Sequence, residues 1–570
     1  MNMSISIGIR KPAPALVRSA DEQIAGMLAW LLVIVLTLFI AGPLVSIFVK
    51  ALHARDGSFA GFSQILQVIA EPRLLAAAGN SVLLALVTTA IVVPMALAFA
   101  FAMTRSRMAG RSVFRLIGLS PLLAPSLMPA ISLVYLFGNQ GILKGWLGPL
   151  SIYGFPGIVM GEVFYTFPHA LLILTAALSV ADARLYEAAE ALGASRMRRF
   201  LTVTLLNARY GMVSAATLVF AMVVTDFGVP KVIGGQTNVL ALEAYKQVIG
   251  QQNFNKGAVI GLLLLLPAVI SFLVERRISR RQGATMTGKS VAYAPKSNTV
   301  RDAALWMFCA FVSVFLIALA GVAIAAAFMK LWPYNLSLTL NHFDFDQLDG
   351  GGWLAFRNSM MLSALTSVAG TGLVFLTAYL VAKLPIPRMA STLIRSLALL
   401  PMAVPGMVLG LGYVLFFNAP GNPLNVLYAG MTLLVASTVS HFHTTAYLTL
   451  VASLRQIDGE IEAVARSLQR PWWHTCMKVT LPMVVPSLLN VARYLFVSSM
   501  TTVSCVIFLY TPDTVLASVA VMNMDDAGDT AAAAAMASLI FFSSLAVSLL
   551  INAAGAMIER RTQRWRSARA

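Results

Sequence analysis

Long apolar runs alternate with short polar connections along almost the whole chain. A run of about 20 apolar residues is long enough to cross the hydrocarbon core of a bilayer as one helix. The pattern therefore predicts an all-α integral membrane protein with about twelve transmembrane helices. The runs are 28–49, 81–103, 114–137, 157–180, 211–229, 258–274, 305–329, 359–382, 393–417, 426–454, 484–510 and 531–558.

Composition and charge agree with this prediction. Only 11% of the 570 residues are charged, whereas a soluble protein carries roughly 25%. The net charge of +18 could indicate nucleic-acid binding, but most Lys and Arg residues fall in every second connection between the predicted spans. The positive-inside rule places those connections, and both termini, in the cytoplasm. A solvated membrane edge therefore explains the charge, and no nucleic-acid partner is predicted.

The second half of the chain repeats the first with a period of about 276 residues. Asp182 corresponds to Asp458, and "GNSVLLAL" from Gly79 resembles "RNSMMLSAL" from Arg357. Each half holds six predicted spans, an even number, so both halves enter the membrane from the same side, as a parallel repeat. Two such bundles can enclose a pathway between them. The predicted units are a first half at 1–274, a polar linker at 275–302 and a second half at 303–570.

A segment of small and charged residues interrupts the apolar pattern of the first half. It reads "EAAEALGASRMRRFLTVTLL" from Glu187 to Leu206 and lies on the predicted cytoplasmic side. Asp182 and Ser195 are predicted to cap two short helices, and Gly193 to take the left-handed conformation that ends the first of them. Small residues let another backbone approach closely, and the charged side chains offer polar contacts. We interpret the segment as a docking surface for a cytoplasmic partner.

A related segment, "IEAVARSLQRPWWHTCMKVTLP" at 461–482, stands at the equivalent place in the second half. The two segments resemble the coupling loops of permease subunits in bacterial binding-protein-dependent ATP-binding-cassette importers. That loop reads E-A-A, three residues, G, nine residues, I, one residue, L-P. The first copy has Leu206 in place of the proline, and the second copy, which keeps Pro482, is expected to make its turn with Pro471. The coupling positions are Glu187, Ala188, Ala189 and Gly193 in the first copy, and Glu462 (one place out of register), Ala463, Val464, Ala465 and Gln469 in the second.

The resemblance covers both halves and implies a fused permease of the type I importer kind in the bacterial inner membrane. It implies two copies of a cytoplasmic ATPase, a periplasmic solute-binding protein and a small-molecule substrate. The chain itself would hold no cofactor and no metal, would catalyse no reaction, and would leave ATP to the ATPase. Stretches from Val223, Tyr245 and Met500 are most similar to permeases for 2-aminoethylphosphonate. Ferric-iron permeases are also similar and provide the alternative substrate.

Two functions of other classes compete with this interpretation. A proton-coupled secondary transporter also commonly has two six-span halves, but it does not need paired coupling loops. A membrane enzyme needs clustered His, Asp or Glu, and the chain has only six histidines. The three scattered cysteines predict neither a metal site nor a disulfide framework. The sequence "GATMTGKS" at 283–290 fits the phosphate-loop pattern but lacks a preceding strand, so it is interpreted as flexible linker.

A few polar residues fall in or near the predicted spans, where an ionisable group is costly. The candidates for the substrate pathway are Glu162, Thr225, Asp226, Thr501 and Thr502. Thr501 and Thr502 are the repeat counterparts of Thr225 and Asp226. Hydrogen bonding between helices is the alternative role for all of them. His441 and His443 are expected to make polar contacts inside the bundle rather than share a metal. The acidic residues Asp344, Asp346, Asp349, Asp525, Asp526 and Asp529 either contact a binding protein or lie in solvated loops.

Overall fold

The computed structural model describes residues 20–179, 182–283, 293, 295, 297–345 and 351–562, which are almost entirely helical. The label η marks short 3-10 or π segments. The elements of the first half are α1 (Ala20–Leu36), η1 (Thr37–Ala41), α2 (Gly42–Ala51), α3 (Phe62–Ile69), α4 (Pro72–Arg105), α5 (Arg111–Leu119), η2 (Ser120–Leu123), α6 (Leu127–Phe137), α7 (Lys144–Leu147), α8 (Phe155–Ser179), α9 (Ala183–Ala191), α10 (Arg196–Arg199), η3 (Phe200–Thr204), α11 (Leu205–Thr225), α12 (Gly228–Ile233), α13 (Leu240–Tyr245), η4 (Lys246–Gly250) and α14 (Phe254–Gly283).

The second half repeats this order, with a short antiparallel hairpin after its first helix. Its elements are α15 (Thr299–Ala327), β1 (Met329–Leu331), β2 (Asn335–Leu338), η5 (Asn341–Phe343), α16 (Gly352–Lys383), α17 (Arg388–Leu399), η7 (Leu400–Ala403), α18 (Gly406–Phe417), η8 (Pro423–Leu427), α19 (Met431–Arg455), α20 (Glu460–Ser467), α21 (Trp472–Thr475), η9 (Cys476–Thr480), α22 (Leu481–Thr501), η10 (Pro512–Thr514), α23 (Ala517–Asp526) and α24 (Thr530–Thr562). The boundaries proposed for the linker stay a prediction; α14 extends into it as far as Gly283.

The predicted all-α membrane fold in two halves is confirmed. In the part of the chain that the structure describes, nine helices are long and apolar enough to cross a membrane, or up to eleven if each of two bent pairs is one span. The remaining predicted segment, 426–454, forms α19. This helix is long enough to cross a membrane but is too polar to count among the candidate spans. Its counterpart α8 is the most buried candidate span, at 72%. Because protein rather than lipid surrounds this position in each half, polar side chains are tolerated there.

Proline bends the same span in both halves. The bend is 103° between α5–η2 and α6, and 116° between α17–η7 and α18. Ala124 and Val404, at the two bends, have extended backbones. Each precedes a proline (Pro125 or Pro405), whose ring disfavours the helical conformation of the residue before it. The chain therefore leaves the helix and resumes it in another direction, which the sequence analysis had not predicted.

The two halves exchange their first helices. Helix α2 packs against α18 of the second half, and α15 packs against α6, the counterpart of α18 in the first half. Hydrogen bonds follow the same exchange. Tyr413 on α18 donates to the carbonyl of Phe39 at 2.8 Å, and Ser132 on α6 donates to the carbonyl of Leu319 on α15. This exchange ties the halves into one structure.

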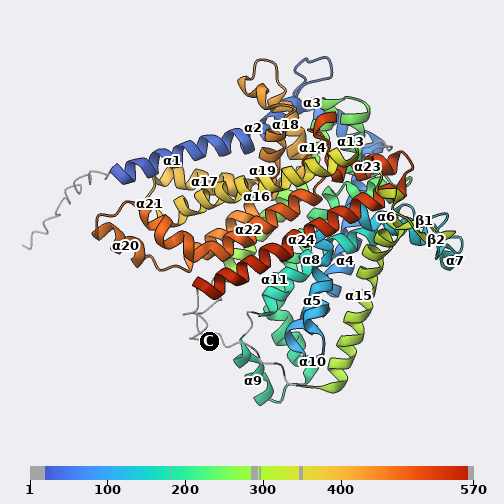
Figure 1. Cartoon of the computed structure of the whole chain (residues 1–570), viewed down its shortest axis with the longest axis horizontal. Coiled ribbons are helices and arrows are strands. Elements are labelled where there is room, and N and C mark those ends of the chain that lie inside the picture. The colour runs from blue at the N-terminus through green and yellow to red at the C-terminus, as the bar shows by residue number, and fades with distance from the viewer. Residues whose placement is uncertain are drawn as a thin grey trace, which may run out of the picture.

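The halves share one end and separate towards the other. Figure 1 shows α6, α13, α18 and α23 gathered at the shared end, whereas α20 with α21 and α9 with α10 form two separate tips. A continuous cluster of buried apolar residues, which includes Leu127, Phe227, Met407 and Met522, crosses the shared end. The separation therefore lies on the side of the two segments that the sequence analysis assigned to docking.

Candidate functional site: two docking segments and a sealed interface

The first docking segment, residues 182–206, has the helix caps that the sequence predicts. Asp182 accepts a hydrogen bond from the backbone N–H of Arg184 at 3.1 Å. Ser195 accepts one from the backbone N–H of Arg198 at 3.3 Å. These bonds satisfy donors that a helix start otherwise leaves unpaired. Both predicted caps are confirmed, and they fix where the two short helices α9 and α10 begin.

The turn between the two short helices has the same shape in both docking segments. Gly193 has φ of +71°, as predicted, and Gln469 at the equivalent place of the second segment (458–482) has φ of +53°. Pro471 caps the start of α21 with an extended backbone, so the expectation that it would make the turn is wrong. The bonds that close the two turns are both 3.0 Å long: the N–H of Ala194 to the carbonyl of Ala189, and the N–H of Arg470 to the carbonyl of Ala465.

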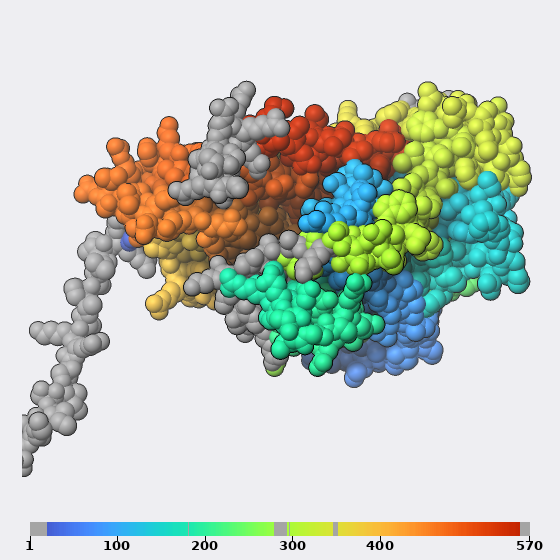
Figure 2. Space-filling model, turned by 90° about the horizontal axis from the view of Figure 1, so that it is seen from below, coloured from blue at the N-terminus to red at the C-terminus, as the bar shows by residue number. Residues whose placement is uncertain are grey.

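Both segments expose apolar side chains at equivalent positions. Leu192 is 87% exposed and its counterpart Leu468 is 66% exposed. In Figure 2 the first segment stands out in turquoise near the centre, and the orange part of the second half that carries the second segment lies at the left. Exposed apolar residues gathered on one surface are typical of a protein-interaction site. The other exposed pairs are Met197 with Trp473 and Leu201 with Met477.

The residues predicted for docking divide into exposed and buried groups. Glu187 and Gly193 are exposed, as is Gln469, whereas the side chain of Glu462 is buried. Glu462 therefore lies within the second segment but not on its surface. Of the remaining predicted positions, Ala188, Ala463 and Val464 are exposed, and Ala189 and Ala465 are partly buried.

Glu462 attaches the second segment to the rest of its half. Its carboxylate lies 3.2 Å from the Nζ of Lys383, the last residue of α16, and both side chains are nearly inaccessible. Lys383 also donates to the carbonyl of Ile457 at 2.8 Å. A buried ion pair of this kind is strongly destabilised when one partner is removed. The pair therefore sets how α20 sits against α16.

A different contact attaches the first segment. Arg105, the last residue of α4, donates to the carbonyl of Leu178 at 2.6 Å. Its guanidinium lies 5.1 Å from the ring of Tyr186 and 4.5 Å from that of Tyr293. Tyr186 stands where Glu462 stands in the repeat, so an arginine beside two contacting aromatic rings replaces the lysine–glutamate pair. Sequence reasoning missed these residues, although a basic residue ends the same helix in both halves.

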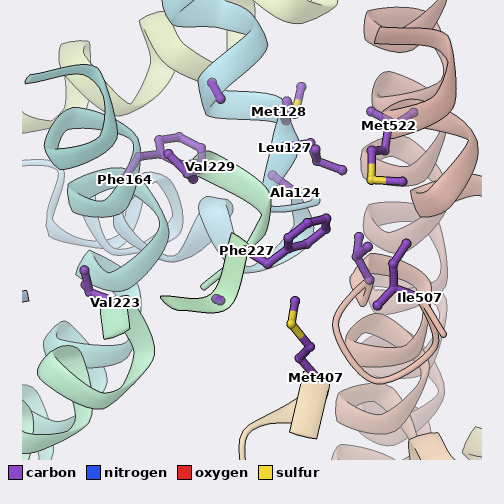
Figure 3. Close-up of a cluster of buried hydrophobic side chains, with 14 of the residues drawn as sticks. Ala124, Leu127, Met128, Phe164, Val223, Phe227, Val229, Met407, Ile507 and Met522 are labelled. Carbon is purple, nitrogen blue, oxygen red and sulfur yellow. The ribbon is translucent and has the colours of Figure 1, made fainter. Parts of the chain in front are cut away.

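At the shared end, an apolar plug closes the interface between the halves. We use this name for Leu127, Met128, Phe227, Met407, Ile507 and Met522, which are at most 2% exposed. In Figure 3 Ala124 and Leu127 lie above the ring of Phe227, Met407 lies below it, and Ile507 and Met522 lie to its right. Phe227 lies where the chain leaves α11, and Met407 is the second residue of α18, the helix after the second bend. These buried side chains fill the interface at this end.

The predicted pathway residues lie beside this plug. Glu162 is fully buried, and Asp226, at the end of α11, is 6% exposed. Thr225 and Thr501 donate their hydroxyls to carbonyls one turn back in their own helices, at 2.9 and 3.0 Å. The hydroxyl of Thr502 lies 3.4 Å from the sulfur of Cys505. The threonine hydroxyls therefore have their partners within their own half.

Histidine and cysteine do not form a metal centre in the described residues. There, no group of three or more His, Cys, Asp or Glu is placed to hold a metal ion. His443 is buried, and its ring stacks on Tyr447 with centroids 6.2 Å apart. Both of its ring nitrogens lack a hydrogen-bond partner among the described residues, so the predicted polar contact is not found.

The acidic residues outside the spans include one contact between the halves. Asp526 pairs with Lys231 of the first half at 3.0 Å. Burial and the neighbouring Asp526 raise the pKa of Asp525 to about 6, while Lys231 opposes the shift. Asp346 and Asp349, and the phosphate-loop-like sequence at 284–290, lie outside the described residues.

Comparison with known proteins identifies the family. The sequence profile of "binding-protein-dependent transport system inner membrane component" matches residues 90–283 and 374–564, one match in each half. The chain belongs to this family of permeases. A ferric transport system permease protein of Actinobacillus pleuropneumoniae is 26% identical over 93% of this chain and 78% of its own length. A putative ferric transport permease of Haemophilus influenzae is 27% identical over 86% and 78%. A sulfate permease of Escherichia coli is 24% identical over 42% of this chain and 84% of its own length.

The permease family gives the site its general role. Both docking segments lie inside the matched ranges, as do Glu162 and Asp226. The chain is a multi-pass inner-membrane subunit of a binding-protein-dependent ATP-binding-cassette importer, and it is not an enzyme. Its partners are an ATPase and a solute-binding protein. The competing interpretations as a proton-coupled transporter and as a membrane enzyme are thereby excluded.

Proposed function

We propose that this single chain forms the whole translocation pathway and that each docking segment binds one copy of a cytoplasmic ATPase, which holds the nucleotide. The carrying observation is the pair of exposed apolar surfaces at equivalent positions in the two halves, around Leu192 and Leu468. Because each surface includes the same turn, two identical partners can bind in the same way. Both chain termini are expected on the side of these segments.

The shape of the molecule supports an alternating-access mechanism. The plug seals the shared end, and the two tips that carry the docking segments stand apart (Figure 1). ATP-driven approach of two ATPases would bring the tips together and open the shared end, where a periplasmic solute-binding protein delivers the substrate. The bends at Pro125 and Pro405 place irregular backbone beside the plug, where non-helical structure is tolerated because protein surrounds it.

For the substrate, we propose ferric iron. Relatives named as ferric permeases match the chain over both halves and about nine tenths of its length. The second candidate is 2-aminoethylphosphonate, favoured by the likeness of the stretches from Val223, Tyr245 and Met500 to permeases for that compound.

Uptake measurements distinguish the two substrates. Cells that lack this chain, and the same cells carrying the intact chain, are given radiolabelled ferric iron or labelled 2-aminoethylphosphonate. Restored iron uptake supports the first proposal. Restored phosphonate uptake with unchanged iron uptake contradicts it and establishes the second candidate. A Gly193→Pro variant at equal expression serves as the transport-defective control, since it distorts only the first docking turn.

A further inference from the structure

Two buried carboxyl groups lie together where α11 ends. Glu162 on α8 is fully buried, and its carboxyl group interacts electrostatically with that of Asp226. Asp226 accepts a hydrogen bond from the backbone N–H of Val229 at 2.9 Å. The two carboxyl groups share a side-chain hydrogen bond, and within the described part of the chain the oxygens of Glu162 have no other partner. Two carboxyl groups offer more acceptor sites than one shared proton fills, so the pair can accept a further ligand.

The pair lies at the interface between the halves and not in the interior of one of them. Gly161, the residue before Glu162, packs closely against Val229, three residues after Asp226, so α8 and the chain that follows α11 meet at the pair. Phe227, which directly follows Asp226, enters the apolar plug (Figure 3). The two carboxyl groups are therefore beside the seal that must open when a substrate passes.

The second half has no such charge at the equivalent place. The counterparts of Glu162 and Asp226 are Thr438 and Thr502. Thr438 donates its hydroxyl to the carbonyl of Leu434 at 2.8 Å, so it is satisfied within its own helix. The acidic pair of the first half thus has a neutral polar pair as its counterpart in the repeat. The difference indicates a role that the fold itself does not require, since the second half forms the same helices without the acids.

Among the described residues, no basic side chain forms an ion pair with the two acids. An ionised carboxylate in the membrane interior is expensive unless it is paired. A cation from outside the chain would supply the missing charge and would also give the oxygens of Glu162 a further partner.

We propose that Glu162 and Asp226 form a cation-binding site in the translocation pathway, which pairs with the positively charged part of the passing substrate. This inference rests on the proposed function, because both candidate substrates supply such a part. Ferric iron is a hard cation for which carboxylate oxygens are suitable ligands, and 2-aminoethylphosphonate carries a primary ammonium group. The site holds its ligand from one half only, so it releases the ligand when the halves move relative to one another.

Neutral variants of nearly the same shape test the site. In the complex with its ATPase and binding protein, Glu162→Gln and Asp226→Asn are compared with Thr438→Val and Thr438→Ser, two changes at the second-half counterpart of Glu162. Losing one member of a buried charge interaction is expected to lower substrate uptake about tenfold or more. ATP hydrolysis stimulated by the loaded binding protein should stay within about twofold, since no docking contact changes. The threonine variants should keep uptake within about twofold.

The outcomes separate this site from the proposed function. Wild-type uptake in the Glu162→Gln/Asp226→Asn double variant overturns the proposed site. If uptake is lost instead, the labelled substrate whose uptake falls, iron or the ammonium compound, is the cation that the site binds. If the intact chain imports neither compound, the proposed substrates fail, and binding of Tb³⁺, a hard trivalent probe, then decides the site. Tyrosine-sensitised terbium luminescence that disappears in the double variant supports it. If the double variant shows the same luminescence as the threonine variants, the proposed cation site is contradicted.

Discussion

The two docking segments present similar surfaces but are attached to the permease in different ways. The exposed pairs Leu192 with Leu468 and Met197 with Trp473 occupy equivalent positions. Beneath them, the ion pair of Lys383 with Glu462 in the second half replaces the contact of Arg105 with Tyr186 in the first. The comparison teaches that the surface available to a partner is preserved where the supporting contact is not. It follows that the two segments should respond differently to equivalent substitutions.

The turns differ in composition but not in shape. Gly193 and Gln469 both take the left-handed conformation. Glycine adopts it freely, whereas a residue with a side chain pays about 1 kcal/mol for it. The second half therefore keeps the turn at a cost, which indicates that the angle between the two short helices matters in both segments.

The largest effect is expected from a change that destroys one of the turns. Gly193→Pro is incompatible with φ of +71°, because proline fixes φ near −65°. It also removes the N–H that bonds to the carbonyl of Glu190. Together these losses cost about 3 kcal/mol or more, so transport and co-purification of the ATPase should largely disappear at normal expression. Gly193→Ala, with a cost of about 1 kcal/mol, should lose only part of both. Full transport by the proline variant would show that the first segment does not dock.

The next largest effect is expected from changes to the contacts that support the two segments, and its size should differ between the halves. Lys383→Met leaves the buried Glu462 without a partner, at a cost of about 3–5 kcal/mol, and should expose the second segment to proteolysis. Arg105→Met removes a cation–π contact and a hydrogen bond, for about 1–3 kcal/mol. Limited proteolysis of both variants measures the difference. Lys383→Met combined with Glu462→Met should recover most of the loss. Equal protection in the two single variants would refute the difference in attachment.

The shared end offers a smaller and pH-dependent contrast. Asp525 on α23 has Ile249 as its counterpart in the first half. Its raised pKa of about 6 means that the folded state favours the protonated form. Its contribution to the free energy of unfolding is therefore fully present below about pH 4 and is lost as the pH rises through about 6. At pH 7.5, Asp525→Asn should increase the free energy of unfolding by about 1 kcal/mol and so raise the thermal midpoint. At pH 4 the substitution should leave the midpoint unchanged. An equal shift at both pH values would contradict this assignment.

The smallest effect is expected from repairing the second turn. Gln469→Gly should stabilise the second segment by about 1 kcal/mol or less, because glycine removes the strain of φ at +53° but adds freedom to the unfolded chain. A modest gain in thermal stability of the ATPase complex would be the readout. The reverse change, Gly193→Gln, should lower it by a similar amount. A loss of stability in Gln469→Gly would mean that the glutamine side chain itself makes a stabilising contact.

Much of the fold could be predicted from the sequence because its signals are local. The apolar runs predicted the helices, and the internal repeat predicted the two halves. Asp182 and Ser195 indicated where α9 and α10 begin, and Gly193 indicated where α9 ends. The exchange of α2 and α15 between the halves could not be predicted, since either bundle can bury such a helix. The left-handed Gln469 was missed because the hydrogen bonds that close the end of α20, and not the residue's own preference, hold that conformation.

The candidate site was harder to predict for the same reason. The motif located both docking segments, but it gave no sign that Glu162 would share a hydrogen bond with Asp226 or that Glu462 would be buried. Partnering depends on which helices meet in space. Tyr293 shows this most clearly, since it lies in the linker, outside both ranges that match the family, and yet contacts Arg105.

The number of ATPase subunits bound to one permease chain tests the central claim most directly. The intact complex is purified through a tag on this chain, and its mass is measured under native conditions with and without Gly193→Pro. The account predicts two ATPase subunits for each wild-type chain, one on each docking segment, and fewer in the variant. A complex with a single ATPase, or one unchanged by the variant, would contradict the claim that both halves dock a partner.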